Sequence, residues 1–340
     1  MKRIVRLAIF LGLLAASVFA LMLFMAAQPN ESYQGEFFLD FERGTPTRHL
    51  ATLLESSGVV RSRWHFLAAR ALHPFSTLKA GEYSFPKPLS PNQVLGKLIR
   101  GEEHYYSLNI PEGYNMFDIA RAVEDLGLIK AKDFLTVARN PNMIRDLSPT
   151  APSLEGFLFP AGYRITRRMT AEQICRQMTG QFRKQWKNLG ASGDPLRTVT
   201  LASLVEKETG VTAERPVVSS VFQNRIAKGM KLECDPTTAY SALLIGVWRD
   251  VIHRSDLDRQ HPYNTYQVTG LPPGPIANPG LASLKAALEP ASTNYLFFVA
   301  RADGSGGHNF SDSLAGHNRA VEQYRRAQHK RNYVAPTSLR

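Results

Sequence analysis

Residues 201 to 209 read LASLVEKET, and they end a helix that we predict over about residues 198–209. At about 100° per residue, one face of this helix is apolar and carries Glu208 at its centre. Glu206 is predicted to point well away from that face, toward a polar side. The apolar side chains that share the face with Glu208 are Leu201, Leu204 and Val205.

This position makes Glu208 a strong candidate for chemistry. A carboxyl group on an apolar face is costly unless it is protonated or paired. Partial burial raises the pKa of such a group, which suits a general acid near neutral pH. The alternative is a glutamate at a helix end whose side chain bends to solvent.

The sequence around this helix predicts a mixed α+β domain. An aromatic turn, EGFLFP at 155–160, precedes the helix, and a loop rich in proline and glycine at 272–280 follows it. The glycine-rich stretch 303–307 lacks the G-K-[ST] sequence of a phosphate-binding loop, so we interpret it as a turn. Further predicted elements are helices at about 171–189, 216–228 and 281–288, a strand at 295–300, and a last helix.

A weak internal repeat occupies the N-terminal part of the chain. Each copy reads as a strand, a glycine turn, a helix and a glycine stop. Two copies are too few for a solenoid, so we predict a pair of small α+β units that either bind the cell wall or serve a structural role. The predicted strands and helices are 37–41, 47–56, 106–110 and 116–125, with a strand-like segment at 78–85 and a helix at about 91–100 between the copies.

The N-terminus predicts a membrane anchor. The residues from Leu7 to Ala27 are uncharged and apolar, and Lys2, Arg3 and Arg6 precede them. A transmembrane helix needs about 20 apolar residues, whereas the apolar part of a signal peptide is usually about 7–15 residues long. We therefore expect a retained single-pass helix with a cytoplasmic N-terminus. Cleavage after Ala27 as a signal peptide is the alternative.

Charge and cysteine content narrow the class of protein. The net charge is +12, which reflects either a solvated basic surface or attraction to anionic lipids or an anionic polymer. Nucleic acid is not an expected partner, because the bulk of the chain is predicted to lie outside the cytoplasm. Cys175 and Cys234 form no C-x-x-C pair and no zinc spacing, so we expect no metal and no cofactor. Whether the two cysteines pair cannot be deduced from their positions.

A series of short motifs follows in a fixed order along the chain. They are KAGEY at 79–83, LEGFLFP at 154–160, LVEKET at 204–209, VFQNR at 221–225, GMKL at 229–232, DPT at 235–237, YNTY at 263–266, GLPPGPI at 270–276, NPG at 278–280 and GHNF at 307–310. In this combination the chain resembles the endolytic murein transglycosylases of the YceG-like family, from the apolar N-terminal run to about Tyr324.

The resemblance implies a LysM-like module beside a lytic transglycosylase domain, with Glu208 as the catalytic acid and base. The implied substrate is the peptidoglycan glycan strand, which is cut between N-acetylmuramic acid and N-acetylglucosamine to leave a 1,6-anhydro end. One carboxyl group acts twice, unlike the carboxylate pair of most glycosidases. The family also implies an inner-membrane protein with a periplasmic catalytic domain, working beside peptidoglycan synthases.

The domain boundaries that we expect follow from these elements. They are a cytoplasmic N-terminus at 1–6, a transmembrane helix at 7–27, a linker at 28–34, a LysM-like repeat region at 35–150, a catalytic domain at 151–328 and a basic tail at 329–340.

Five residues are candidates for substrate binding, and each has a structural alternative. Arg225 would hold a substrate carboxylate, or pair with Glu214. Asp235 would bind sugar hydroxyl groups, or cap a helix at Thr237. The amide, hydroxyl and ring of the next three candidates suit a hexosamine, and their alternative role is to clamp a loop. They are Asn264, Thr265 and Tyr266.

Two histidines could suggest other chemistry, and the sequence departs from the family pattern at two places. His308 and His317 belong to no H-E-x-x-H or G-x-S-x-G motif, so we assign them turn and core roles. Ala161-Gly162 replaces the usual Asp-Thr of the family, which leaves a binding role for that turn open. Glu233 stands where the family often has glutamine, and it would raise the pKa of Glu208 further if the two carboxyl groups are close.

Three other functions compete with a lytic transglycosylase. A wall-binding scaffold would use only the LysM-like part. A muramidase would hydrolyse the same bond with water, using Glu233 or Asp235 as its second carboxylate. A basic nucleic-acid binder is disfavoured by the anchor.

Overall fold

The computed structural model describes the backbone of residues 2–33 and 35–334, and side chains as far as residue 328. The predicted basic tail from residue 335 onward and Gln34 of the predicted linker lie outside the described residues. The chain forms two compact units. The first contains the residues through Tyr106 together with Arg164–Met169, and the second contains Ser107–Tyr163 and the residues from Thr170 onward.

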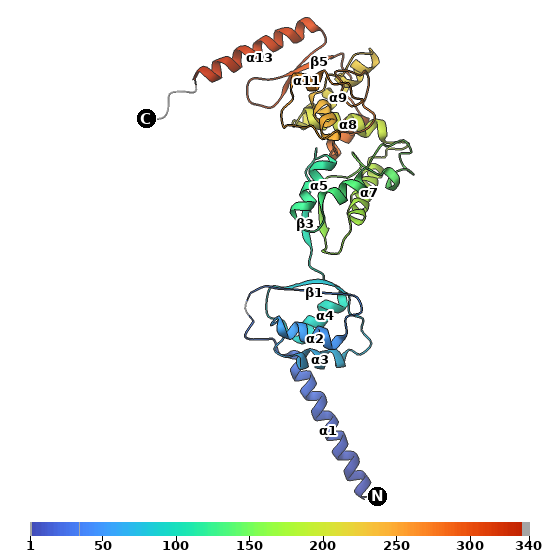
Figure 1. Cartoon of the computed structure of the whole chain (residues 1–340), viewed down its shortest axis with the longest axis vertical. Coiled ribbons are helices and arrows are strands. Elements are labelled where there is room, and N and C mark those ends of the chain that lie inside the picture. The colour runs from blue at the N-terminus through green and yellow to red at the C-terminus, as the bar shows by residue number, and fades with distance from the viewer. Residues whose placement is uncertain (1, 34, 335–340) are drawn as a thin grey trace. The chain divides into compact units, whose positions relative to one another are not determined.

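The first unit combines a long apolar helix with a small α+β layer. Figure 1 shows α2, α3 and α4 gathered beside strand β1. Strand β1 pairs antiparallel with β2, with Leu39 opposite Tyr83. The elements are α1 (Lys2–Ala27), β1 (Phe37–Phe41), α2 (Thr47–Ser56), α3 (Arg63–Leu72), β2 (Gly81–Phe85) and α4 (Pro91–Arg100).

The sequence explains why these elements form where they do. Helix α4 begins with a complete capping box between Ser90 and Gln93, and Gly101 ends it in the left-handed conformation. The helices and strands enclose one apolar core. Burial of this apolar surface offsets the conformational entropy that the chain loses when the layer forms. Its largest fully buried members are Leu50, Leu54, Phe66, Tyr83, Phe85, Leu95 and Leu98.

Helix α1 confirms the predicted apolar N-terminal helix. It is the one helix among the described residues that is long and apolar enough to cross a membrane. Its large apolar side chains are exposed along its length, and only Ala26 near its end is buried. A helix of this kind is compatible with a single-pass anchor.

The second unit is mainly helical and carries short two-stranded sheets, so the mixed α+β class is confirmed. The predicted boundary between residues 150 and 151 lies inside this unit. Its elements, with the first residue of β3 and the end of β4 assigned to the first unit, are β3 (Tyr106–Asn109), α5 (Met116–Asp125), α6 (Ala131–Ala138), η1 (Pro141–Met143), β4 (Gly162–Ile165), α7 (Ala171–Asn188), α8 (Leu196–Glu208), η2 (Thr212–Glu214), α9 (Arg215–Ala227), α10 (Asp235–Leu244), α11 (Arg254–Leu257), α12 (Leu281–Leu288), β5 (Phe297–Ala300), β6 (His308–Ser311) and α13 (Leu314–Val334).

Helix α8 is the centre of this unit. It packs against α9, α10 and α12, and Figure 1 shows it beside α9. Every residue from Val199 to Val205 is buried, including the polar Thr200 and Ser203, so this stretch has no solvent-facing side. The predicted division of the helix into a buried apolar face and an outward polar face is therefore wrong. The hydroxyls of Thr200 and Ser203 donate to the backbone carbonyls of Leu196 and Thr200, so both can be enclosed by the neighbouring helices.

Glu206 does not lie on a solvent-facing side either. Its side chain is 5% exposed, and its Oε1 lies 3.0 Å from Nη2 of Arg215. Its Oε2 accepts a hydrogen bond of 3.0 Å from the backbone N–H of Gly280. A Cβ at Gly280 would overlap the carboxylate of Glu112, so a larger residue here would have to displace that flexible side chain. Glu206 thus ties α8 to α9 and to the start of α12.

The aromatic turn at 155–160 holds a second buried carboxyl group. Glu155 accepts hydrogen bonds from the backbone N–H of Met116 at 2.9 Å, the hydroxyl of Tyr240 at 3.0 Å and the amide of Asn278 at 2.8 Å. These contacts join α5, α10 and the proline-rich loop. Gly156 follows with φ +84°, where a Cβ would collide with Pro275 and with α8.

The burial of Glu155 predicts a pH-dependent contribution to stability. Burial raises the pKa of Glu155 from 4.5 to about 8. The folded protein therefore binds this proton more tightly than the unfolded chain, and stability falls as pH rises between these two values. We expect Glu155→Gln to show a smaller decrease in Tm between about pH 5 and pH 8 than the wild type. Parallel decreases in thermal unfolding scans of the two proteins would contradict this assignment.

Candidate active site

Glu208 is the last residue of α8 and opens into a cavity of about 270 Å³. The cavity wall comes from α8, α9, the segment that leads into α10, strand β5 and helix α13. Phe222, Leu232 and Phe298 provide its apolar part. The other lining residues are Glu208, Arg225, Glu233, Cys234, Asp235, Tyr266 and His317.

The environment of Glu208 favours the protonated acid. Burial is the main cause that raises its pKa, and the nearby charge of Asp235 raises it further. A hydrogen bond from Cys234 and the charges of His308 and Arg225 act in the opposite direction. In the described part of the chain Glu208 has no ion-pair partner, so no cation fully compensates its charge. A carboxyl group held in this way can donate a proton near neutral pH.

The thiol of Cys234 holds one oxygen of Glu208. Its Sγ lies 2.9 Å from Oε1 of Glu208, and burial raises the pKa of the thiol well above its ordinary value. The group therefore stays protonated and donates to the carboxylate. The sequence suggested no role for Cys234 beyond a possible disulfide, and both Cys234 and Cys175 are free and buried.

Arg225 lines the cavity but is largely committed to the protein. Its guanidinium donates to the backbone carbonyls of Leu296 at 2.6 Å and Leu232 at 2.9 Å, and it lies over the ring of Phe297. Its ion-pair partner is Glu233 at 3.4 Å. The alternative partner Glu214 instead pairs with His308, so that expectation was wrong.

Asp235 and Tyr266 meet at the edge of the cavity. The Tyr266 hydroxyl donates to Oδ1 of Asp235 at 2.6 Å, and Asp235 is exposed. Asp235 starts α10, whose N-cap is Cys234, and Thr237 donates to the carbonyl of that N-cap residue at 2.6 Å. Hence Asp235 and Tyr266 present oxygen atoms and a ring at the cavity that Glu208 also lines.

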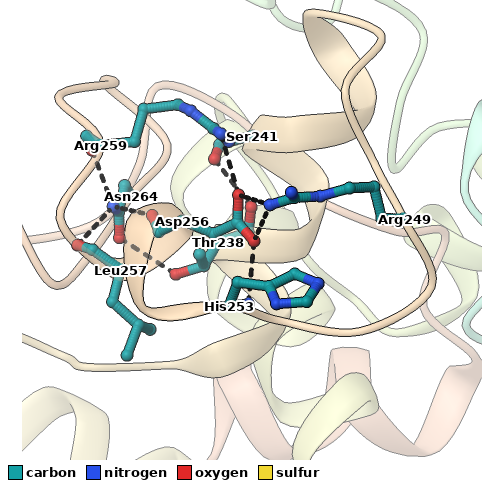
Figure 2. A network of polar contacts seen from close by, with 8 residues as sticks. All are labelled: Thr238, Ser241, Arg249, His253, Asp256, Leu257, Arg259 and Asn264. Carbon is teal, nitrogen blue, oxygen red and sulfur yellow. Dashed lines mark hydrogen bonds and ion pairs between the residues drawn. The ribbon is translucent and has the colours of Figure 1, made fainter.

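Asn264 and Thr265 lie behind the cavity wall. Figure 2 shows Asn264 inside a polar network, where its amide donates to the carbonyls of Asp256, Leu257 and Arg259. Its Oδ1 accepts from the hydroxyl of Thr238 at 3.0 Å. Asn264 is 0% exposed. These contacts are those of the loop-clamp alternative.

The network in Figure 2 also explains how the loop before Tyr266 keeps its shape. Asp256 is buried, and its carboxylate accepts from the backbone N–H of His253 at 2.9 Å. Arg249 and Arg259 approach the same carboxylate at 3.3 Å and 2.9 Å. Buried charges of this kind are stable only when paired and hydrogen-bonded, as they are here.

Thr265 supports the segment that carries Glu233 and Cys234. Its hydroxyl accepts from the backbone N–H of Cys234 at 3.0 Å, and its carbonyl accepts from the N–H of Glu233 at 3.2 Å. Glu233 adopts φ 50°, which is uncommon for a residue with a side chain. Glu233 lines the same cavity as Glu208, but the neighbouring carboxylate that raises the pKa of Glu208 is Asp235.

The two histidines differ in their surroundings. The Nδ1 atom of His308 forms a hydrogen bond of 2.8 Å with Oε2 of Glu214, and this contact fixes the turn into β6. His317 lines the cavity and stacks on Phe297, and its buried Nδ1 has no hydrogen-bond partner. The core role assigned to His317 from the sequence therefore did not include its position at the cavity that Glu208 lines. Its position depends on how α13 packs against β5, which no local pattern reveals. Among the described residues there is no cluster of side chains that could hold a metal ion.

Comparison with known proteins places the chain in a family. Residues 39–323 match the YceG-like family. An endolytic murein transglycosylase of Bacillus subtilis is 32% identical, with 84% of each chain covered. One from Streptococcus pneumoniae is 29% identical over 83% of this chain and 57% of its own length. The crystal structure of a yceG-like protein from Listeria monocytogenes has a TM-score of 0.54 and 30% identity, covering 84% of this chain and 99% of that one.

The contact between Cys234 and Glu208 predicts how the acid responds to substitution. Cys234→Val removes the donor, keeps a similar size and suits the extended backbone at this position. Because the lost hydrogen bond stabilised the carboxylate, the pKa of Glu208 should rise. Cys234→Ser retains a donor and should show no such rise. Carboxyl NMR titration of both variants measures this, and an unchanged pKa in Cys234→Val would contradict the role given to the thiol.

Proposed function

The chain belongs to the YceG-like family, and from this premise we propose that it is a membrane-anchored endolytic lytic transglycosylase of peptidoglycan. It cuts the bond between N-acetylmuramic acid and N-acetylglucosamine within glycan strands and leaves 1,6-anhydro ends. Cleavage of this kind would end the elongation of nascent strands. The observation that carries the proposal is Glu208, a half-buried acid with a raised pKa at the wall of a cavity.

The mechanism uses the single carboxyl group of Glu208 twice. The acid gives its proton to the glycosidic oxygen, the bond from that oxygen to C1 of the muramic acid breaks, and an oxocarbenium-like state forms. The resulting carboxylate takes the proton from the O6 hydroxyl of the same sugar. O6 then bonds to C1, which closes the 1,6-anhydro ring and returns Glu208 to its protonated form.

Two of the predicted binding residues are proposed to contact the sugars directly. Asp235 is exposed, and with Tyr266 it offers hydrogen-bonding groups and a ring at the cavity edge. The other three, Arg225, Asn264 and Thr265, are proposed to position the residues of the site without contacting the sugars. Arg225 fixes the segment that carries Glu233 and Cys234, while Asn264 and Thr265 hold the loop that ends at Tyr266.

A muramidase is the second candidate, because Glu233 and Asp235 line the same cavity as Glu208. Each carboxylate has a protein partner, Arg225 for Glu233 and Tyr266 for Asp235, which argues against a free general base. Mass analysis of muropeptides released from sacculi separates the two reactions. Anhydro ends support the transglycosylase, reducing ends support the hydrolase, and no products support a non-catalytic wall-binding scaffold.

The N-terminal unit is proposed to position the enzyme. Helix α1 would anchor it in the inner membrane with the N-terminus in the cytoplasm. The rest of the chain would then lie in the periplasm, beside peptidoglycan synthases. The small α+β layer formed by β1, β2 and α2–α4 would serve as the LysM-like module that orients a strand without cutting it.

The two neighbouring glutamates of α8 should respond in opposite ways to the same substitution. Glu208→Gln removes the transferable proton, so the rate of anhydro-muropeptide release should fall by at least about 10²–10⁴-fold with little change in Tm. Glu206→Gln removes the nearer of the two carboxylates that face buried Arg215 and leaves Glu112 at 3.6 Å, so the free energy of unfolding should fall by about 1–3 kcal/mol. Its rate per folded molecule should stay near that of the wild type.

Both variants need assays well below their Tm, normalised to the folded fraction. Loss of catalysis in folded Glu206→Gln with an active Glu208→Gln would transfer the acid to Glu206. Two active variants would remove the catalytic role from this helix.

The proposed topology makes a separate prediction. A reporter enzyme that is active only in the periplasm, fused after Arg340, should be active in cells. N-terminal sequencing of the membrane-bound protein should find α1 still attached. A mature chain that begins near Gln28, or a reporter that works only in the cytoplasm, would contradict the anchor.

A further inference from the structure

A larger recess adjoins the cavity of Glu208. It has a volume of about 410 Å³, and Asp235 lines both spaces. Asp118, Arg121 and Lys207 line this recess and also a further cavity of about 320 Å³. The three spaces therefore form a connected row. Asp235 is shared by the first and second, and Arg121 by the second and third. The proposed function uses only the first of these spaces.

The recess combines aromatic walls with charges of both signs. Phe117, Tyr240 and Trp248 contribute rings. Arg121 and Lys207 contribute cations, and Asp118 and Asp250 contribute anions. A neutral N-acetylated sugar leaves such charges without partners. A short peptide that carries carboxylates, an ammonium group and methyl side chains matches them, because each charge finds an opposite and each ring an apolar contact.

The cations of the recess are available to a ligand. Arg121 is exposed, and within the part of the chain that the structure describes its guanidinium has no hydrogen-bond or ion-pair partner. Lys207 makes only a long hydrogen bond of 3.3 Å to the carbonyl of Gly113. An anionic group that enters the recess would therefore gain charge-assisted hydrogen bonds without breaking an existing ion pair.

The chemistry of the substrate brings such a peptide to this place. In peptidoglycan the stem peptide is attached through the lactyl group of the same muramic acid whose C1 is attacked. The point where the peptide is attached to the sugar therefore lies next to the scissile bond. From there the peptide can reach Asp235 and the adjoining recess. The stem contains alanine methyl groups, free carboxylates and a diamino acid.

Building on the proposed function, we propose that the recess bounded by Arg121, Lys207 and Trp248 binds the stem peptide of the muramic acid at the cleavage site. The enzyme then distinguishes strands that carry peptides from strands that have been stripped of them. Binding energy gained in the recess fixes the register of the muramic acid over Glu208 and favours cleavage of nascent, peptide-bearing strands.

The test compares two substrates that differ only in the peptide. Uncross-linked glycan strands are divided, and one half is treated with an amidase that removes the stems. Arg121→Ala and Trp248→Ala should lower kcat/KM on the peptide-bearing strands by about tenfold or more, and leave kcat/KM on the stripped strands near the wild-type value. Arg197→Ala, at an exposed arginine of α8 outside all three cavities, is the control and should affect neither.

Equal losses on both substrates would assign the recess to the sugars and overturn the proposal, as would no loss on either. Binding measured in the Glu208→Gln background keeps this result separate from catalysis. There, Arg121→Ala should weaken binding of peptide-bearing strands alone. If it does not, the peptide site is wrong while the role of Glu208 stands. If Glu208→Gln still cleaves strands, the proposed function is wrong, and the binding comparison still decides the peptide site.

Discussion

The second unit depends on the complete burial of helix α8. From Val199 to Val205 the helix is surrounded by protein, yet its last turn carries two carboxyl groups. The fold treats them differently. Glu206 pairs with Arg215 at 3.0 Å and accepts from the N–H of Gly280, which fixes α8 to its neighbours. Among the described residues Glu208 accepts a hydrogen bond from the Cys234 thiol and has no ion-pair partner, and we infer that this difference leaves Glu206 structural and Glu208 free to react.

The surroundings of Glu208 are themselves held by buried polar contacts. Asn264 closes the loop that leads to Tyr266, and Thr265 supports the strained segment at Glu233. On the other side of α8, Glu155 gathers hydrogen bonds from three separate elements. Disturbing a network of this kind lowers the stability of the fold, because removal of one member leaves its partner as a buried polar group without a hydrogen bond. They keep the cavity wall in a single arrangement, which positions the acid.

Local patterns predicted much of the fold. The ranges 47–56, 91–100 and 116–125 were predicted as helices and form α2, α4 and α5, because the apolar spacing and glycine stops that define them lie within a few residues. Helix α3 was missed although Ser62 supplies its N-cap. Helix α10 was considered only as the alternative role of Asp235, which would cap a helix at Thr237, although Pro236 lies in its first turn. Both are as long as α2, α4 and α5, but their apolar positions become decisive only once their partners are known.

The candidate site could be predicted only in part. Glu208, Arg225, Asp235 and Tyr266 meet at one cavity, as their order in the sequence motifs suggested. The place of Glu206 could not be deduced, since its partner Arg215 and the N–H of Gly280 come from other elements. Cys234 and His317 were missed for the same reason. Contacts between distant segments decide which polar residue is clamped and which is free to react.

The protonation state of Glu208 in the resting enzyme is the most direct test of this account. Infrared difference spectra between the wild type and Glu208→Gln, recorded across a pH titration, isolate the C=O stretch of this one protonated carboxyl group. The account predicts that the band persists above pH 4.5, the usual pKa of a glutamate, because desolvation raises the pKa of Glu208. A band that disappears at or below that pH would show an ordinary surface carboxylate, and would contradict the claim that this one acid performs both proton transfers.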